Sequence, residues 1–203
     1  MTLAEPVAFL DVDTQVDFMK PEGKLYAQGA EAIEPNLRRL LDFARERGLP
    51  LVSSVDAHRE GDEEFAEYPP HCLLGTPGQQ RVLASGEEAF VPSEAVAGEL
   101  PDPRRQHVVL EKQRFSLFSN PNAEAVLART GAKTFVVFGV VTEVCVRQAV
   151  LGLLERGYRV CVVRDAVWPI ARDAGEAALE EMRAAGAEVL STDEVLSTLA
   201  VTM

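Results

Sequence analysis

The chain has 203 residues, 47% of them hydrophobic, which suits one domain with a substantial core and no disulfide framework. Its 32 acidic residues outnumber the 20 basic ones and give a net charge of −12, with no Lys/Arg-rich run, so a nucleic-acid partner is not expected. No leader pattern at residues 1–6 and no apolar run of ~18 residues is found, so we expect a cytoplasmic protein without a membrane partner.

Short runs rich in β-branched residues alternate with longer amphipathic runs along the chain. The predicted strands cover residues 7–13, 49–56, 107–112, 134–140, 158–167 and 187–191. The predicted helices cover residues 31–48, 122–130, 142–157, 173–186 and 193–200. This order predicts a three-layer α/β fold, in which helices cover both faces of a mostly parallel, doubly wound sheet of six strands.

One segment, at about 57–106, interrupts this alternation. It is rich in Pro, Gly and Glu and, at about fifty residues, far exceeds the roughly 2–6 residues that usually join a strand to a helix. Ligands bind beyond the carboxyl ends of the strands in open parallel sheets. We therefore expect a single domain over residues 1–203, with this insertion helping to build a site at the strand ends.

The first predicted strand and the residues just after it supply three carboxylates that could act as a general base, Asp11, Asp13 and Asp17. Side chains alternate along a strand, so Asp11 and Asp13 are predicted to share one face, opposite Val12. Asp13 lies nearer the carboxyl end and is the better candidate. The alternative is that it caps a helix or forms a turn, as aspartates at strand ends often do.

A second group of polar residues follows the next predicted strand. Asp56 and His58 are two residues apart, and His71 follows after a loop that contains Glu64. Oxygen and imidazole ligands on a loop suit a divalent metal ion with open positions for water; zinc is the first expectation, and manganese or iron are the alternatives. The competing interpretation is a polar surface loop with capping carboxylates.

The third predicted strand ends at Lys112, which alone could extend into solvent. Cys145 lies in the first turn of a predicted helix, where Thr142 is the expected N-cap and the positive helix end should favour a thiolate over a thiol of pKa ~8.5. The other thiols are Cys161, expected in the core, and Cys72; an odd count at irregular spacing suits reduced cysteines. A Cys, an Asp and a Lys at three strand ends would meet in one crevice.

The chain resembles the nicotinamidase branch of the isochorismatase-like cysteine hydrolases over about residues 7–190. The matching motifs are V-D-T-Q-V-D-F (12–18), D-A-H (56–58), Y-P-P-H-C-L-L-G-T-P-G (68–78), E-K (111–112) and G-V-V-T-E-V-C-V (139–146). Isochorismatases proper generally lack the metal-binding histidines and the P-P-H-C motif. The order and spacing of the motifs therefore favour the nicotinamidase side of the family.

The resemblance implies roles for particular residues. Asp13 and Lys112 match catalytic residues and Cys145 matches the nucleophile. A cis peptide is implied between Val140 and Val141, with the amides of Val141 and Cys145 forming an oxyanion hole. The implied metal ligands are Asp56, His58, Glu64 and His71, with Glu64 binding directly or through water. The implied substrate-binding rings are Phe18 and Tyr68.

Two departures from the family pattern concern the substrate: Val16 replaces a frequent Asn, and the stretch after Lys112 does not follow one subfamily. The first hypothesis is hydrolysis of nicotinamide to nicotinate and ammonia through a thioester on Cys145. The second keeps this machinery for an N-carbamoyl, ureido or other small amide. The third is a non-catalytic metal- or ligand-binding module. Assembly into a homo-oligomer is left open, and no G-x-G-x-x-G supports a dinucleotide site.

Overall fold

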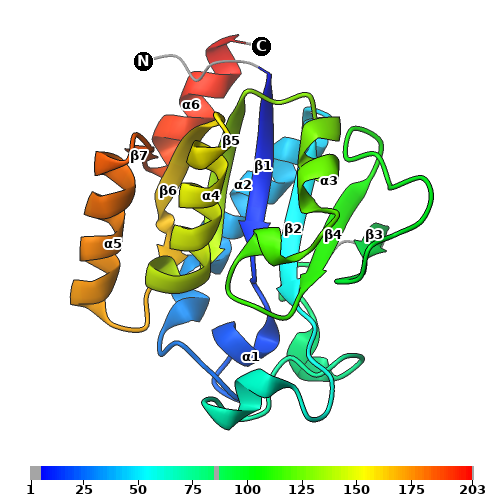
Figure 1. Ribbon diagram of the computed structural model, residues 1–203. Coiled ribbons are helices and arrows are strands. Elements are labelled where there is room, and N and C mark those ends of the chain that lie inside the picture. The colour runs from blue at the N-terminus through cyan, green and yellow to red at the C-terminus, as the bar shows by residue number, and fades with distance from the viewer. Residues whose placement is uncertain (1–5, 85–86, 203) are drawn as a thin grey trace.

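A parallel sheet of seven strands runs through the centre of the computed structural model, which describes residues 6–84 and 87–202 (Figure 1). The strands are ordered β3-β4-β2-β1-β5-β6-β7 across the sheet. Their bounds are β1 (Val7–Val12), β2 (Leu51–Asp56), β3 (Glu88–Val91), β4 (His107–Lys112), β5 (Thr134–Val140), β6 (Arg159–Trp168) and β7 (Glu188–Leu190). All neighbouring strands pair in parallel, so their carboxyl ends meet at one edge.

Helices cover both faces of this sheet, which confirms the predicted three-layer, doubly wound α/β fold (Figure 1). The front face carries α3 (Ala123–Arg129), α4 (Arg147–Glu155) and α5 (Arg172–Ala184). The back face carries α2 (Glu34–Glu46) and α6 (Thr192–Thr202), and the short α1 (Val16–Met19) lies beyond the end of β1. In the part of the chain that the structure describes, no helix has the length and apolar character needed to span a bilayer.

The central strand β5 shows why the sheet is buried on both sides. All seven of its residues are buried, and alternate side chains enter two separate apolar clusters. Phe135 and Val137 join the cluster under α3 and α4, whereas Val136 and Phe138 join the cluster under α2. A continuous apolar strand is what a parallel sheet with two covered faces requires.

The strand order reverses between β1 and β5, because β2, β4 and β3 extend to one side of β1 while β6 and β7 extend beyond β5. In open α/β sheets, such a switch point opens a crevice beyond the carboxyl ends of the two strands. Asp13 follows β1 and Cys145 follows β5. The topology therefore brings these two residues to the same crevice.

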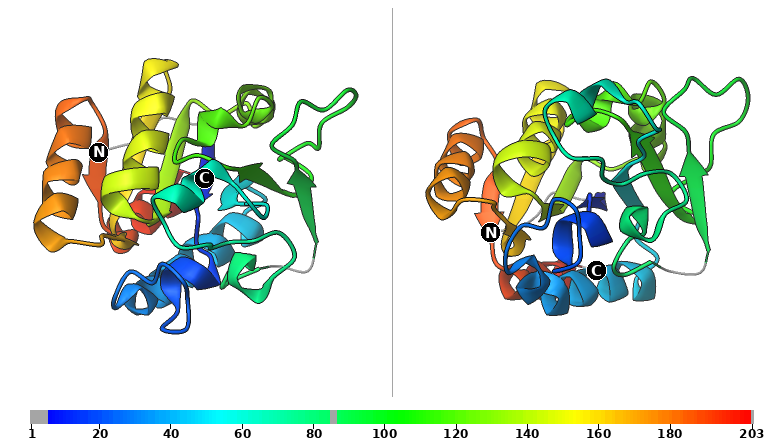
Figure 2. Two further views of the ribbon diagram at one scale, coloured as in Figure 1. Left: turned by 60° about the horizontal axis from the view of Figure 1, so that its bottom comes forward. Right: turned by 90° about the horizontal axis from the view of Figure 1, so that it is seen from below.

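The sequence prediction of six strands missed β3, which lies inside the insertion and forms the sheet edge beside β4. This strand has only four residues, and of these Phe90 is exposed and Val91 is buried. Short edge strands with few buried side chains leave a weak alternation pattern. Much of the remaining insertion spreads across the carboxyl ends of the central strands (Figure 2).

Gly139 is the glycine on which this crevice depends most clearly. It lies in β5 with φ of 122°, and a side chain there would collide with the carbonyl oxygen of Val12 on the neighbouring strand. We expect Gly139→Ala to lower the free energy of unfolding by about 2–4 kcal/mol, through backbone strain and the separation of β1 from β5.

Gly48→Ala is a matched control for this change. Gly48 also has positive φ, of 60°, but the space around it is open, so only about 1 kcal/mol is expected to be lost. Urea denaturation of both variants measures the difference. Equal losses in the free energy of unfolding for the two variants would show that the close approach of Gly139 to Val12 does not contribute to stability.

Candidate active site and metal centre

Lys112 occupies the centre of a buried polar cluster at the end of β4. Its Nζ atom lies 2.8 Å from Oδ2 of Asp13, is ion-paired with Oδ1 of Asp56, and lies 3.8 Å from Sγ of Cys145. Lys112 is 1% exposed, and Asp13 and Cys145 are 0% and 7% exposed. The structure thus brings the Cys, Asp and Lys singled out in the sequence to one ammonium group.

Asp11 and Asp13 do not share a face as the strand alternation predicts, and this expectation was wrong. Ser53 donates a hydrogen bond to Asp11 at 3.1 Å and Ser54 donates one to Asp13 at 2.6 Å. Consecutive residues of a strand point to opposite faces, so the two aspartates do so as well. The reason is that Asp13 lies beyond the end of β1 with φ of 51°, and this left-handed backbone turns its side chain toward Lys112.

The other two carboxylates considered as candidate bases, Asp11 and Asp17, have separate partners. Asp11 is buried and ion-paired with Arg81 at 2.5 Å. Asp17 accepts hydrogen bonds from the backbone N–H of Cys72 at 2.6 Å and of Lys24 at 3.0 Å. Of the three candidate bases, Asp13 is the one that contacts Lys112.

Cys145 lies in a π-helical turn (Thr142–Val146) that follows β5 and precedes α4. The expectation that Thr142 caps this helix was wrong: the residue before the turn is Val141, and the buried Thr142 hydroxyl has no hydrogen-bond partner among the described residues. The helix begins one residue earlier than expected, so Thr142 faces the interior. The peptide bond between Val140 and Val141 is cis.

The electrostatics of the cluster differ from the simple expectation of a thiolate. Burial raises the pKa of the Cys145 thiol well above its usual range; the Lys112 ammonium opposes this effect, and the neighbouring Asp13 carboxylate adds to it. Burial also raises the pKa of Asp13, although Lys112 opposes that shift too. Burial would lower the pKa of Lys112, but Asp13 and Asp56 outweigh it and keep the ammonium charged. These directions favour a protonated Cys145 thiol beside Asp13 and the Lys112 ammonium.

Asp56, His58 and His71 form a group that could hold a metal ion, with one ligand atom from each residue within 4.8 Å of the others. The Nε2 atoms of His58 and His71 lie 3.7 and 3.8 Å from Oδ2 of Asp56. Both Nε2 atoms are buried without a hydrogen-bond partner in the described structure. Buried polar atoms normally have a partner, so this donor set fits a divalent cation. Glu64 extends the group, with Oε1 3.8 Å from Nε2 of His71.

The second ring nitrogen of each histidine is held by a neighbour. Nδ1 of His58 lies 3.1 Å from Oδ2 of Asp62, and Nδ1 of His71 lies 2.9 Å from the carbonyl oxygen of Pro69. Such partners orient metal-binding imidazoles and select the tautomer that leaves Nε2 free. Asp56 keeps a low pKa, because the Lys112 ammonium and the two histidines outweigh the effect of burial.

Removal of the Asp62 carboxylate should weaken metal binding without removing a ligand. We expect Asp62→Ala to lower the affinity for zinc by roughly 10–100-fold, the usual effect of losing a hydrogen bond to a metal-binding histidine. Competition with a chromogenic chelator measures the change. Glu63→Ala is the control, because Glu63 is exposed and pairs with Arg114 on the surface; a similar loss in both variants would contradict a specific role for Asp62.

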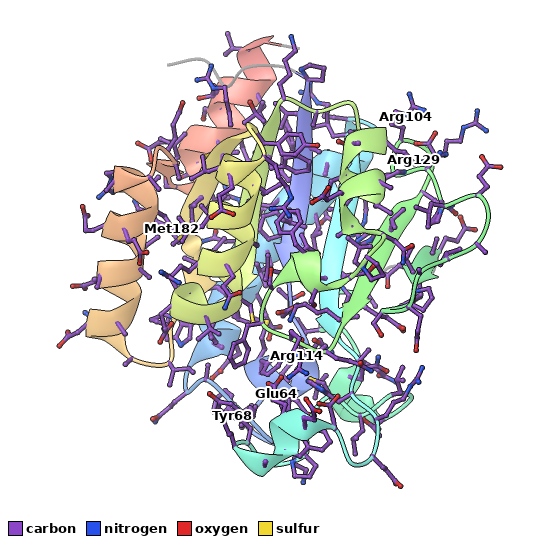
Figure 3. All side chains as sticks on the ribbon, in the orientation of Figure 1. Glu64, Tyr68, Arg104, Arg114, Arg129 and Met182 are labelled. Carbon is purple, nitrogen blue, oxygen red and sulfur yellow. The ribbon has the colours of Figure 1, made fainter. Side chains whose placement is uncertain are left out.

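A cavity of about 370 Å³ opens directly onto Cys145, Asp56 and His71. Its wall is mostly apolar and aromatic and includes the side chains of Phe18, Leu25, Tyr26, Glu64, Tyr68, Phe115, Val144 and Ile170. Figure 3 shows Glu64 and Tyr68 together at the carboxyl end of the sheet, far from Arg104 and Arg129. The expected substrate-binding residues Phe18 and Tyr68 thus line the same space as the thiol.

Sequence reasoning missed two residues that organise this site. Ser54 orients Asp13, and its position two residues before Asp56 on one strand face was a usable signal. Gln15 accepts a hydrogen bond from the N–H of Asp56 at 2.7 Å and donates to its carbonyl oxygen at 2.9 Å. No pattern in the sequence indicates that long-range contact.

The other two cysteines lie outside the cluster around Lys112. Cys161 is fully buried in β6, as expected for a core residue, and burial raises its pKa to about 12. Cys72 is also buried, and its Sγ atom lies 4.0 Å from the carbonyl oxygen of Gly78. Burial, reinforced by nearby carboxylates, raises the pKa of Cys72 far above the usual range. Neither thiol competes with Cys145 for the cavity.

The chain is similar to known proteins in both sequence and structure. The chain is 27% identical over 200 residues to the nicotinamidase/pyrazinamidase of Mycobacterium tuberculosis, covering 90% of this chain and 97% of that protein. It is 24% identical over 163 residues to an N-carbamoylsarcosine amidase of Arthrobacter sp, covering 79% and 58%. The crystal structure of Pyrococcus horikoshii pyrazinamidase in complex with zinc superposes with a TM-score of 0.77 at 30% identity, covering 92% of this chain and 99% of that one.

A family model described as the isochorismatase domain matches residues 7–194, from the first strand of the sheet into α6. That range includes the buried cluster around Lys112, the histidine pair and the cavity that opens onto Cys145 and His71. The match therefore extends over the whole sheet and the candidate site. The chain belongs to the isochorismatase domain family.

Proposed function

We propose that this protein is a metal-assisted cysteine amidohydrolase that converts nicotinamide, or a carboxamide on a similar ring, to the acid and ammonia. The observation that carries the proposal is the 370 Å³ cavity, whose aromatic and apolar wall leads to both Cys145 and the metal-ligand group. A flat ring gains from burial against such a wall. The relatives named above support amide chemistry of this kind.

In the proposed first step, Asp13 takes the proton of the Cys145 thiol as sulfur attacks the carboxamide carbon. The raised pKa of Asp13 makes its carboxylate a better proton acceptor than an ordinary aspartate. The Lys112 ammonium, 3.8 Å from the sulfur, stabilises the developing thiolate. Ser54 donates a hydrogen bond to Oδ1 of Asp13, whereas Lys112 lies beside Oδ2, and these two contacts hold the carboxylate in place for the transfer.

The following steps use the same groups. The amides of Val141 and Cys145 would stabilise the oxyanion of the tetrahedral adduct. The proton on Asp13 would then pass to the amide nitrogen, so that ammonia leaves and a thioester remains on Cys145. Asp13, again a carboxylate, would deprotonate a water molecule that attacks the thioester. Acid and free thiol are released, and the proton returns to sulfur.

Asp56, His58 and His71 would hold the metal ion, with Glu64 as a further ligand, directly or through water. Zinc is the proposed metal, and manganese or iron also suit this set of oxygen and imidazole donors. Bound there, the ion would act as a Lewis acid toward a ring nitrogen or its water and so orient the substrate.

One observation favours a second candidate, an amide that also carries a carboxylate, such as an N-carbamoyl amino acid. Lys24 lies on the cavity wall, and among the described residues its ammonium has no ion-pair partner. A cation at that position could bind a substrate carboxylate. The relative that acts on N-carbamoylsarcosine supports this alternative.

Ammonia release from nicotinamide, pyrazinamide and N-carbamoyl amino acids, with zinc and with chelator, tests the proposal. We expect turnover of the two ring amides by the zinc-loaded protein, and a marked fall with chelator. Exclusive turnover of N-carbamoyl substrates would replace the first candidate with the second. No ammonia from any of these amides would contradict an amidohydrolase of either kind.

A further inference from the structure

Ile170 is an unusual residue because it is large, apolar and 68% exposed. It lies in the turn between β6 and α5, after Trp168 and Pro169. Ile170 is also among the residues that line the cavity that opens onto Cys145. A single exposed isoleucine needs no explanation elsewhere on a surface, but here it forms part of the wall of the space in which chemistry is proposed.

The turn that carries Ile170 is held by a carboxylate next to the nucleophile. Oε1 of Glu143 accepts hydrogen bonds from the backbone N–H of Ile170 at 2.9 Å and of Ala171 at 3.0 Å. Glu143 belongs to the same π-helical turn as Cys145, two residues earlier. The position of Ile170 is thus fixed relative to the sulfur through one side chain.

A second contact also holds this turn. Gly175, in the first turns of α5, packs so closely on Pro169 that a Cβ atom at residue 175 would lie 2.5 Å from the proline Cβ. The N–H of Gly175 also donates to the carbonyl oxygen of Ala171 at 2.9 Å. The turn is therefore a supported element, and it places Ile170 at the edge of the cavity.

We propose that Ile170 is a specificity-determining residue, which packs on the ring of the substrate, and that Glu143 is the positioning residue that holds it there. The inference rests on the proposed function. Substrate binding would cover an apolar side chain that is otherwise open to water, and this gain is available to a ring but not to a small linear amide. The assignment goes beyond Phe18 and Tyr68, which contact the cavity from the first motif and the insertion.

The first test is Ile170→Ala, measured as kcat and KM for nicotinamide. We expect KM to rise about 10-fold, the usual effect of losing apolar contacts in a pocket, with little change in kcat. The rate of Cys145 alkylation by iodoacetamide should stay unchanged, because this small electrophile needs no ring contact. Val201→Ala is the matched control, since Val201 is 89% exposed on α6 and lies outside the cavity.

Variants at Glu143 test the positioning role. Glu143→Ala removes the acceptor for both N–H groups and should raise KM as Ile170→Ala does. Glu143→Gln keeps an acceptor oxygen and should restore most of the affinity. If Glu143 acts through Ile170, the double variant with both alanines should bind no more weakly than either single variant, whereas independent effects would multiply.

The outcomes separate this inference from the proposed function. If the wild type releases no ammonia from any ring amide, the proposed function fails and the inference fails with it. If the wild type hydrolyses nicotinamide but Ile170→Ala leaves KM unchanged, the inference alone is wrong. If the rises in KM multiply in the double variant, Glu143 does not act through Ile170. If Glu143→Ala slows the alkylation of Cys145, Glu143 acts on the nucleophile instead.

Discussion

Cys145→Ala is expected to abolish ammonia release, with a fall in kcat on the order of 10⁴-fold or more, because among the described residues no other thiol lines the cavity to form the thioester. The replacement removes one buried sulfur and leaves Asp13, Lys112 and the histidine pair in place. Zinc affinity should therefore match that of the wild type. Loss of activity with metal binding retained distinguishes an enzyme from a non-catalytic binding module.

Cys161→Ala is the control for this variant, because it also removes a fully buried thiol but from the core of β6. It should lower stability and leave the chemical step unchanged. Steady-state ammonia assays on both variants, with zinc bound, give the comparison. Substantial turnover by Cys145→Ala would contradict a thioester intermediate on Cys145.

Lys112→Met is expected to have the largest effect on stability. The substitution leaves the carboxylates of Asp13 and Asp56 buried without their cation, and removing one partner of a buried ion pair costs about 3–5 kcal/mol. Proton uptake by Asp13 would relieve part of that cost, but a protonated Asp13 can no longer accept the thiol proton. Activity should therefore fall with stability.

Lys20→Met provides the control, since the Lys20–Glu34 pair is 2.6 Å long but partly exposed. Pairs of that kind contribute about 0–1 kcal/mol. Urea denaturation in the presence of chelator compares the two variants without a metal contribution. If Lys112→Met lost no more stability than Lys20→Met, Lys112 could not be the central cation of this cluster.

Much of the sheet could be predicted from the sequence because its central strands are apolar on both faces. Runs such as β5 and β6 need no long-range information to be recognised. The edge strand β3 could not be predicted, because its stability comes from pairing with β4 and not from its own four residues. Tertiary contacts decide such short strands.

The candidate site divides in a similar way. The positions of Asp13, Lys112 and Cys145 follow from the ends of parallel strands, which the alternating pattern already indicates. The sequence does not predict toward which face of the sheet the Asp13 side chain points, because this depends on a single left-handed backbone angle. The sequence does not predict the pKa of Cys145 either, because burial outweighs the Lys112 cation, and burial depends on how the whole chain packs around the thiol.

The most direct test of the central claim is to trap the intermediate. Rapid acid quench of the zinc-loaded protein during nicotinamide turnover, followed by mass spectrometry of the intact chain and its peptides, should show one nicotinoyl group on the peptide that contains Cys145. The group should disappear as the substrate is exhausted and be absent in Cys145→Ala. Acylation of Cys72 or Cys161 instead would contradict the account, as would ammonia release by Cys145→Ala at the wild-type rate.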